Sequence, residues 1–252
     1  MKEGYVHINI EHPVAVIEFF HPAHKSLPGN ILSQLANTIT ETGKREDVHL
    51  IVLKSGGDRT FCAGASFNEL IAIEDFPTGK QFFMGFANVI NAMRKCPKLI
   101  LCRVQGKTVG GGVGIAAAAD YTMATKFASV KLSELAVGIG PFVVGPAVER
   151  KLGVSAFSQM AINATEWQTA KWAKEKGLFT EVFESGEQLD DYIQHFTDKL
   201  KTMNPEAMGL LKKVFWEGCE NWDTLLEERA EMSGRLVLSD FSKNAIGAFL
   251  KG

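Results

Sequence analysis

The sequence predicts an α/β protein whose core alternates strands with helices and whose last part is helical. Strand patterns and amphipathic helical patterns follow one another along most of the 252 residues, and 46% of the residues are hydrophobic, enough for a sizeable core. In addition, two strands each lead into a glycine-rich loop, at residues 61–65 and 109–114. The order helix, strand, loop, helix is therefore used twice, although no sequence repeat of fixed period accompanies it.

The chain opens with two strand patterns, residues 5–10 and 14–20, which are separated by a turn at Glu11-His-Pro13. We expect a hairpin here. The elements predicted after it are a helix around residues 31–39, a strand at 50–53, a helix at 82–95, strands at 99–104 and 121–124, and helices at 147–152, 156–161, 166–176 and 189–203.

Composition limits the classes of function. Lys and Arg number 27 and Asp and Glu 29, so the net charge of −2 provides no general attraction for nucleic acid or an anionic membrane, and neither is an expected partner. The four cysteines lie far apart with no histidine at metal-ligand spacing, which predicts buried, reduced thiols and no metal site. The first residues lack a leader pattern and no apolar run approaches about 18 residues, so we expect a soluble, cytoplasmic protein.

The triple glycine Gly110-Gly-Gly112 follows an apolar strand and opens an alanine-rich helix. Its N–H groups would lie at the positive end of the helix dipole, where they could bind an anion or a developing oxyanion. A Walker phosphate loop is not predicted, because Ile115-Ala116 stands where its Lys-Ser/Thr pair belongs, and a dinucleotide fingerprint lacks its third glycine. For this loop alone, glycines that merely permit tight packing are an equal alternative.

The other glycine-rich segment, Phe-Cys-Ala-Gly-Ala at residues 61–65, also follows a strand. One N–H donor from each loop could therefore converge on a single oxygen and form an oxyanion hole. Each such donor contributes about 2.7–4 kcal/mol to the transition state, so a pair could supply much of what enolate formation requires.

Three segments in order, GGDRTFCAGA at residues 56–65, VQGKTVGGG at 104–112 and then Asp120, resemble the crotonase, or enoyl-CoA hydratase/isomerase, superfamily. The resemblance covers nearly the whole chain and is strengthened by residues 20–25, 132–138 and 170–178. It implies a right-handed spiral of ββα units with a C-terminal helical region, assembled as a homotrimer or a dimer of trimers. Residues 1–190 would then form the spiral core with acyl-CoA binding and catalysis, and residues 191–252 would supply oligomer contacts and cover the pocket.

The resemblance also implies the site residues. The oxyanion donors would be the N–H groups of Ala65 and Gly111, and coenzyme A enters as part of an acyl-CoA substrate rather than as a separate cofactor. This chain has Ser66 where the family commonly has Asp, and Asn68 at a frequent lysine position, so its nucleotide contacts are expected to differ. The residues implied in substrate or coenzyme A binding are Lys25, Ala63, Ser66, Phe67, Asn68, Gly110 and Phe142.

Hydration in this family uses two glutamates, and this chain has only one of them. The first position is Gly114, which cannot carry a proton, and the second is Glu134. A lone carboxylate is sufficient to move a double bond, because it can remove an α-proton from a 3-enoyl thioester and return a proton to the γ-carbon. Apolar neighbours of Glu134 would raise its pKa toward neutrality. Phe82, Phe83 and Phe86 could join Phe142 around the acyl group, although a plain core role is an equal alternative.

The sequence therefore favours an enoyl-CoA isomerase that converts 3-enoyl to 2-enoyl thioesters. A hydratase with an atypical site and a non-catalytic acyl-CoA-binding protein are the alternatives, and generic phosphate binding at the triple glycine ranks last. Because family members share a fold while differing in reaction, the choice depends on the site.

Overall fold

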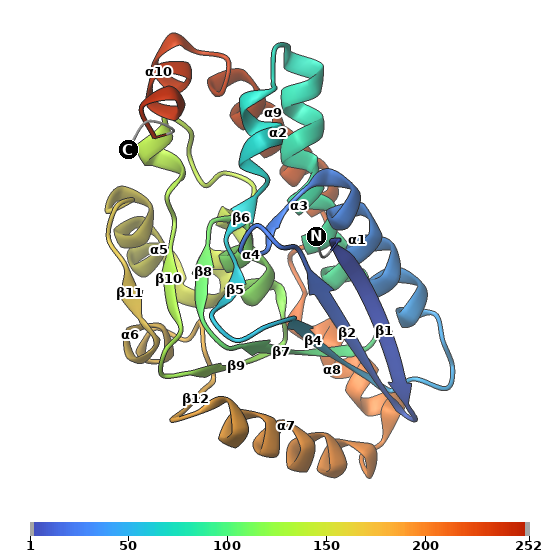
Figure 1. Ribbon diagram of the computed structural model, residues 1–252. Helices are drawn as coiled ribbons and strands as arrows, with labels where there is room; N and C mark the ends of the chain where they lie inside the picture. Colours follow the sequence, from blue (N-terminus) through green and yellow to red (C-terminus); the bar gives the residue numbers. More distant parts are fainter. Residues whose placement is uncertain (1–2, 250–252) are drawn as a thin grey trace.

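The computed structural model describes residues 3–249 and contains a six-stranded sheet (Figure 1). In spatial order its strands are β1 (Tyr5–Glu11), β2 (Val14–Phe20), β4 (Leu50–Ser55), β7 (Leu99–Val104), β9 (Tyr121–Thr125) and β12 (Glu181–Phe183). β1 and β2 pair antiparallel as the expected hairpin, and every later neighbour pairs parallel.

A second, four-stranded sheet lies beside the first. Its spatial order is β11 (Gln168–Thr169), β10 (Ser129–Lys131), β8 (Lys107–Val109) and β5 (Thr60–Cys62), and a third pair joins β3 (Ser26–Leu27) to β6 (Gly64–Ala65). The chain runs from β4 into β5, from β7 into β8 and from β9 into β10, so each turn adds one strand to each sheet before a helix follows. This is the predicted spiral of ββα units.

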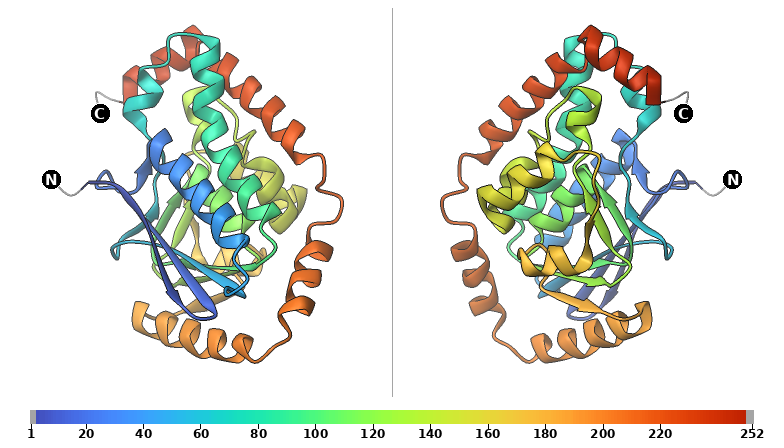
Figure 2. Two further views of the ribbon diagram at one scale, coloured as in Figure 1. Left: turned by 90° about the vertical axis from the view of Figure 1, so that its right-hand side faces the viewer. Right: turned by 90° about the vertical axis from the view of Figure 1, so that its left-hand side faces the viewer.

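The helices cover both faces of the large sheet (Figures 1 and 2). Their bounds are α1 Gly29–Gly43, α2 Phe67–Ile71, α3 Phe76–Lys95, α4 Gly111–Ala118, the 3₁₀ turn η1 Glu134–Val137, α5 Gly145–Ile162, α6 Ala170–Glu175, α7 Gly186–Lys201, α8 Pro205–Phe215, α9 Trp222–Leu236 and α10 Asp240–Phe249. Alternation along β4 shows the two faces: Ile51 and Leu53 join the main core with α1, α3, α4 and α5, whereas Leu50 and Val52 pack with α7.

The sequence located the main elements, and one prediction was wrong in part. Residues 14–20 and 99–104 form strands with the predicted bounds. The helix predicted for residues 166–176 begins only at Ala170, because Gln168 and Thr169 pair with β10 and the Thr169 side chain caps α6 by accepting the Trp172 N–H at 3.1 Å. Helix α7 runs across residue 190, and the division into residues 1–190 and 191–252 stays a prediction.

A buried ion pair joins α8 to the sheet. Lys212 Nζ lies 2.6 Å from Asp120 Oδ2, and the two side chains are only 2% and 4% exposed. Asp120 Oδ2 also accepts the Ile100 backbone N–H at 2.8 Å, while its Oδ1 accepts the Trp216 indole N–H at 3.1 Å. Both oxygens of this carboxylate are therefore satisfied, as a buried charge requires.

The C-terminal helices close one end of the molecule through a packing cluster separate from the main core. Its buried members are Ile73, Ile139, Val237 and Ile246. Gly138, in the left-handed conformation with φ of 77°, ends η1, and a Cβ there would lie 2.6 Å from Phe241 Cδ1 and Ser242 Oγ. The loop that begins with Glu134 is thus held in place by α10.

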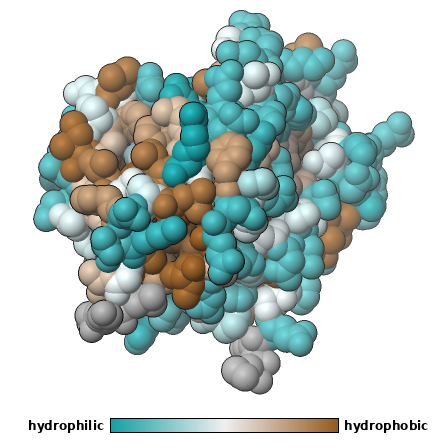
Figure 3. Space-filling view, turned by 90° about the horizontal axis from the view of Figure 1, so that it is seen from above, coloured by the Kyte–Doolittle hydropathy of each residue, from teal (hydrophilic) through white to brown (hydrophobic). Residues whose placement is uncertain are grey.

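Apolar side chains also gather on the surface of the end that carries α2 and α10 (Figure 3). The exposed ones include Ile71, Leu135 and Phe241, and a second exposed group lies on α8 at Leu210, Leu211, Val214 and Phe215. Assembly into trimers stays a prediction. The four cysteines are buried as expected, and none of the helices within residues 3–249 has the length and apolar character that a membrane span requires.

Candidate active site

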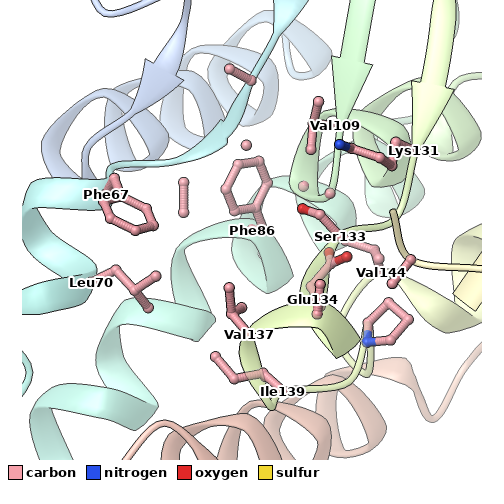
Figure 4. A pocket seen from close by; sticks show the side chains of 18 of the residues that line it. Phe67, Leu70, Phe86, Val109, Lys131, Ser133, Glu134, Val137, Ile139 and Val144 are labelled. Atoms are coloured by element: carbon pink, nitrogen blue, oxygen red, sulfur yellow. The ribbon is translucent and has the colours of Figure 1, made fainter. Parts of the chain in front are cut away.

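A pocket of about 800 Å³ lies between the two glycine-rich segments, η1 and α3. Its lining is mostly apolar, and Figure 4 shows Glu134 on the wall opposite Phe67 and Leu70. The predicted site residues that line it are Ala63, Ala65, Phe67, Gly110, Gly111, Glu134 and Phe142, and Phe82, Phe83 and Phe86 line it as well. The fold therefore brings segments far apart in sequence to one cavity of a size typical for small ligands.

The first glycine-rich segment is fixed by pairing with β3. Ser66 N–H donates to the Leu27 carbonyl at 2.9 Å, and Ser26 Oγ donates to the Ala65 carbonyl at 2.6 Å. Ala63 N–H likewise donates to the Lys25 carbonyl at 3.2 Å, so residues on both sides of Gly64 and Ala65 are held by the segment that contains β3. Gly64, with φ of 93°, provides the left-handed turn that brings Ala65 to the pocket.

The second glycine-rich segment places a helix start at the pocket. Gly110 N–H donates to the Lys131 carbonyl at 2.9 Å, which anchors the loop to β10. Hydrogen bonding within α4 begins with Val113 N–H, which donates to the Gly110 carbonyl at 2.9 Å. The N–H of Gly111 therefore belongs to the first turn, where an α-helix has no internal acceptor and the helix dipole favours negative charge.

The glycines here permit close approach between functional parts. A Cβ at Gly112 would lie 2.7 Å from Cys62 Cβ, so the two glycine-rich segments pack directly against each other. Gly110 has φ of 52°, and a Cβ there would lie 2.9 Å from Glu134 Oε1. The Glu134 carboxylate is thus packed against the backbone that leads into Gly111.

Glu134 is the first residue of η1, and its carboxylate lies against the pocket wall. The residue is partly exposed, but Oε2 is shielded from water and has no hydrogen-bond partner among the described residues. Burial raises the pKa of Glu134 from an ordinary value of 4.5 to about 7, and a backbone hydrogen bond opposes this only weakly. A carboxylate with such a pKa can both accept and release a proton near neutral pH.

Position 114 is closed. Gly114 is buried within α4, and a Cβ there would lie 2.6 Å from Val144 Cγ1 and 3.3 Å from Ile90 Cδ1. Val144 is itself 3% exposed. A carboxylate side chain at this position would have to displace Val144. Among the described residues that line the pocket, Glu134 is the only acid.

Three residues predicted to bind coenzyme A lie outside the pocket lining. Lys25 is 8% exposed, its Nζ lies 5.5 Å from the centroid of the Phe20 ring, and burial lowers its pKa. Ser66 caps α2, because its Oγ accepts the Glu69 N–H at 3.3 Å. Asn68 is exposed on α2. Their role in binding stays a prediction.

The sequence missed several residues that line the pocket. Lys131 and Ser133 come from the end of β10 and the turn after it, Trp167 precedes β11, and Ser233 and Ala245 come from α9 and α10. The strand β10 has three residues and β11 has two, which is too short for an alternation pattern to show. The position of Lys131, Ser133 and Trp167 depends on pairing between strands that the sequence did not reveal.

The stacked ββα turns, with a pocket between the two glycine-rich segments, form the crotonase fold. A solved structure of an enoyl-CoA hydratase from Bacillus halodurans matches it with a TM-score of 0.90, covering 97% of this chain and 99% of that chain at 20% identity. One from Mycobacterium avium paratuberculosis, a putative enoyl-CoA hydratase, gives 0.87, covering 98% of this chain and 96% of that chain at 24% identity.

The chain belongs to the enoyl-CoA hydratase/isomerase family, whose model matches residues 9–250. It is 26% identical to a short-chain-enoyl-CoA hydratase from Clostridium acetobutylicum, over 100% of this chain and 96% of the relative. It is also 23% identical to a peroxisomal Δ(3,5)-Δ(2,4)-dienoyl-CoA isomerase from Arabidopsis thaliana, over 90% of this chain and 86% of the relative. The protein is therefore an acyl-CoA enzyme of this family, and relatives at this distance include both hydratases and isomerases.

Proposed function

We propose that this enzyme is an isomerase that converts 3-enoyl-CoA to 2-enoyl-CoA with Glu134 as its single acid/base group. The observation that carries the proposal is the combination of a single pocket acid, Glu134, whose Oε2 has no hydrogen-bond partner among the described residues, with a position 114 that Val144 closes. A hydratase needs a second group to orient and activate water, and Val144 fills that space. Moving a double bond needs no water.

The thioester carbonyl would lie between the N–H groups of Ala65 and Gly111. Both residues line the pocket, and the Gly111 donor adds the favourable end of α4. Removal of the α-proton by Glu134 converts the thioester to a dienolate, whose negative oxygen these two donors stabilise. The same carboxyl group then gives the proton to the γ-carbon, and the double bond ends between the α- and β-carbons. Atoms and charge balance within the substrate and Glu134.

The apolar lining supports this chemistry. A charged carboxylate in a pocket with little water is a stronger base than in solution, which is the reason for its raised pKa. Phe86, Val137 and Ile139 provide apolar surface near the carboxylate, while Ser133 and Lys131 are polar groups on the same side of the pocket (Figure 4). With Val144 at the position of the second acid, proton return to carbon is favoured over addition of water.

The test replaces Glu134 by glutamine. We expect Glu134→Gln to lower the isomerisation rate of 3-hexenoyl-CoA about 100- to 10,000-fold, because positioned acid–base groups contribute that much. Wild-type hydration of 2-hexenoyl-CoA should be far slower than isomerisation. Conversion is followed by absorbance and by chromatography of the products.

Glu149→Gln is the matched control, because Glu149 is exposed on α5 and lies outside the pocket. An unchanged isomerisation rate in Glu134→Gln would remove this residue from the mechanism. Rapid hydration by the wild type would show that water enters despite Val144, and tight acyl-CoA binding without any turnover would indicate a non-catalytic member of the family.

A further inference from the structure

Lys131 brings a positive charge to a pocket that is otherwise mostly apolar. It is the last residue of β10 and lies next to Val109 in the parallel register with β8. Its own carbonyl accepts the Gly110 N–H, so its backbone is one hydrogen bond away from the loop that leads into Gly111. Figure 4 shows the Lys131 amino group pointing toward Val109, with Ser133 and Glu134 along the same side of the pocket.

The strand geometry explains why this side chain faces the pocket. Thr108 and Val130 are paired in register, and both are fully buried on the core side of the second sheet. Because side chains alternate along a strand, Lys107, Val109 and Lys131 all lie on the opposite side. Val109 and Lys131 line the pocket there, and Lys107 is exposed.

The indole ring of Trp167 lies near the ammonium groups of both Lys107 and Lys131. The centroid of its indole ring lies 4.7 Å from Lys131 Nζ and 5.4 Å from Lys107 Nζ, which are cation–π distances. Trp167 lines the pocket and is 39% exposed. Within residues 3–249, neither lysine has an acidic group within salt-bridge distance.

The acid of the pocket does not neutralise Lys131. No ion pair joins Lys131 to Glu134 among the described residues, and no lysine contributes to the pKa of Glu134, which burial raises and a backbone hydrogen bond partly lowers. Two lysines therefore contact one aromatic ring, and none of the ion pairs among the described residues supplies them with a carboxylate. The site therefore lacks a negative group that a ligand can supply.

We propose that Lys131, backed by Trp167 and Lys107, binds a carboxylate at the far end of the acyl chain, so that the preferred substrates are thioesters of dicarboxylic 3-enoic acids. This proposal rests on the proposed function, whose substrate class it narrows. The phosphates of coenzyme A could supply the same anionic oxygens. The long pantetheine arm separates those phosphates from the thioester, however, whereas Lys131 lines the same pocket as Gly111 and its backbone carbonyl accepts the N–H of the preceding residue, Gly110.

Binding of inert ligands tests the proposal without relying on turnover. Adipoyl-CoA and hexanoyl-CoA are saturated six-carbon thioesters that differ only in the terminal carboxylate, and calorimetry gives their affinities for the wild type, Lys131→Met, Lys131→Arg and Lys171→Met. We expect wild type to prefer adipoyl-CoA about 10- to 100-fold, as a charge-assisted hydrogen bond to a carboxylate provides. Lys131→Met should reduce that ratio to near one, and Lys131→Arg should retain most of it. Lys171 is the matched control, because its side chain is 87% exposed on α6.

Two further outcomes distinguish an acyl carboxylate from a coenzyme A phosphate as the group that Lys131 binds. If the two ligands bind the wild type equally, the acyl carboxylate is excluded, while isomerisation of 3-hexenoyl-CoA still measures the proposed function independently. If Lys131→Met weakens both coenzyme A esters but changes neither of the matching pantetheine thioesters, which lack the nucleotide phosphates, then Lys131 binds a phosphate and the proposal is overturned. Retention of the adipoyl preference in adipoyl-pantetheine, together with its loss in Lys131→Met, supports it.

Discussion

Asp120 and Glu134 both carry a carboxylate that is largely shielded from water, but their hydrogen-bond and ion-pair partners differ. Asp120 has an ion pair with Lys212, a backbone N–H from Ile100 and an indole N–H from Trp216. Glu134 has an Oε2 atom without a hydrogen-bond partner among the described residues and a pKa raised to about 7 by burial. The sequence marks both residues as parts of the family pattern, although only one of them faces the pocket.

The difference teaches which carboxylate holds the fold and which one is available for chemistry. A buried charge with every lone pair satisfied stabilises one arrangement of the chain, and its removal exposes the partner it neutralised. A carboxylate left unsatisfied costs stability and gains proton affinity, which is a feature of functional sites. Asp120 therefore anchors α8 to the sheet, whereas Glu134 presents a carboxylate oxygen without a partner among the described residues at the pocket.

The largest expected effect on stability comes from Asp120→Asn. The substitution keeps the shape of the side chain but leaves the Lys212 ammonium buried without its counter-ion. We expect a loss of about 3–5 kcal/mol in the free energy of unfolding, measured by urea denaturation. Asp191→Asn on the exposed side of α7 is the control and should change stability little. A loss below about 1 kcal/mol for Asp120→Asn would mean that the comparison between the two carboxylates fails, since breaking a buried pair costs more.

A second effect on stability tests whether packing at position 114 excludes a second acidic side chain from the pocket. Gly114→Ala adds a Cβ that meets Val144, and overpacking of this kind costs about 1–3 kcal/mol. The cost should fall when Val144→Ala is present in the same chain, and a double-mutant cycle from denaturation curves measures this coupling. Gly247→Ala is the matched control, because a Cβ there meets no atom within 4 Å. Additive effects of the two substitutions would show that Val144 does not close position 114.

The third expected effect is a pH-dependent change in stability at Glu134. Its folded pKa of about 7 lies above the ordinary 4.5, so the folded state binds the proton more tightly than the unfolded state. Stability from this residue is therefore complete below about pH 4.5 and is lost as the pH rises through 7. Glutamine resembles the protonated form, so Glu134→Gln should raise Tm more at pH 8 than at pH 5, by about 2–4 °C for each kcal/mol of relief.

Thermal melts of wild type, Glu134→Gln and Glu149→Gln at the two pH values provide this measurement. Glu149 is exposed, so its substitution should shift Tm equally at both. The comparison is contradicted if Glu134→Gln gives the same Tm difference from wild type at pH 5 and pH 8.

Backbone motifs were predictable from the sequence, and side-chain neighbourhoods across strands were not. The two glycine-rich loops and Glu134 line one pocket, and the sequence could indicate them because glycine spacing and a helix start leave a direct trace in it. Lys131 and Trp167 could not be found, since their contact depends on the register of two very short strands. Lys25 illustrates the opposite case: its motif was recognised, yet the side chain packs over Phe20 outside the pocket lining.

A small cluster of Ile73, Ile139, Val237 and Ile246 supports one wall of the pocket. These side chains hold α10 and the segment after Glu134, but they share no buried member with the core between the sheet and its main helices. Regions with few buried contacts open at lower cost than the whole fold. We therefore expect the pocket wall made by α10 and the segment after Glu134 to open at lower cost than either sheet, so that ligand binding is lost before the fold is.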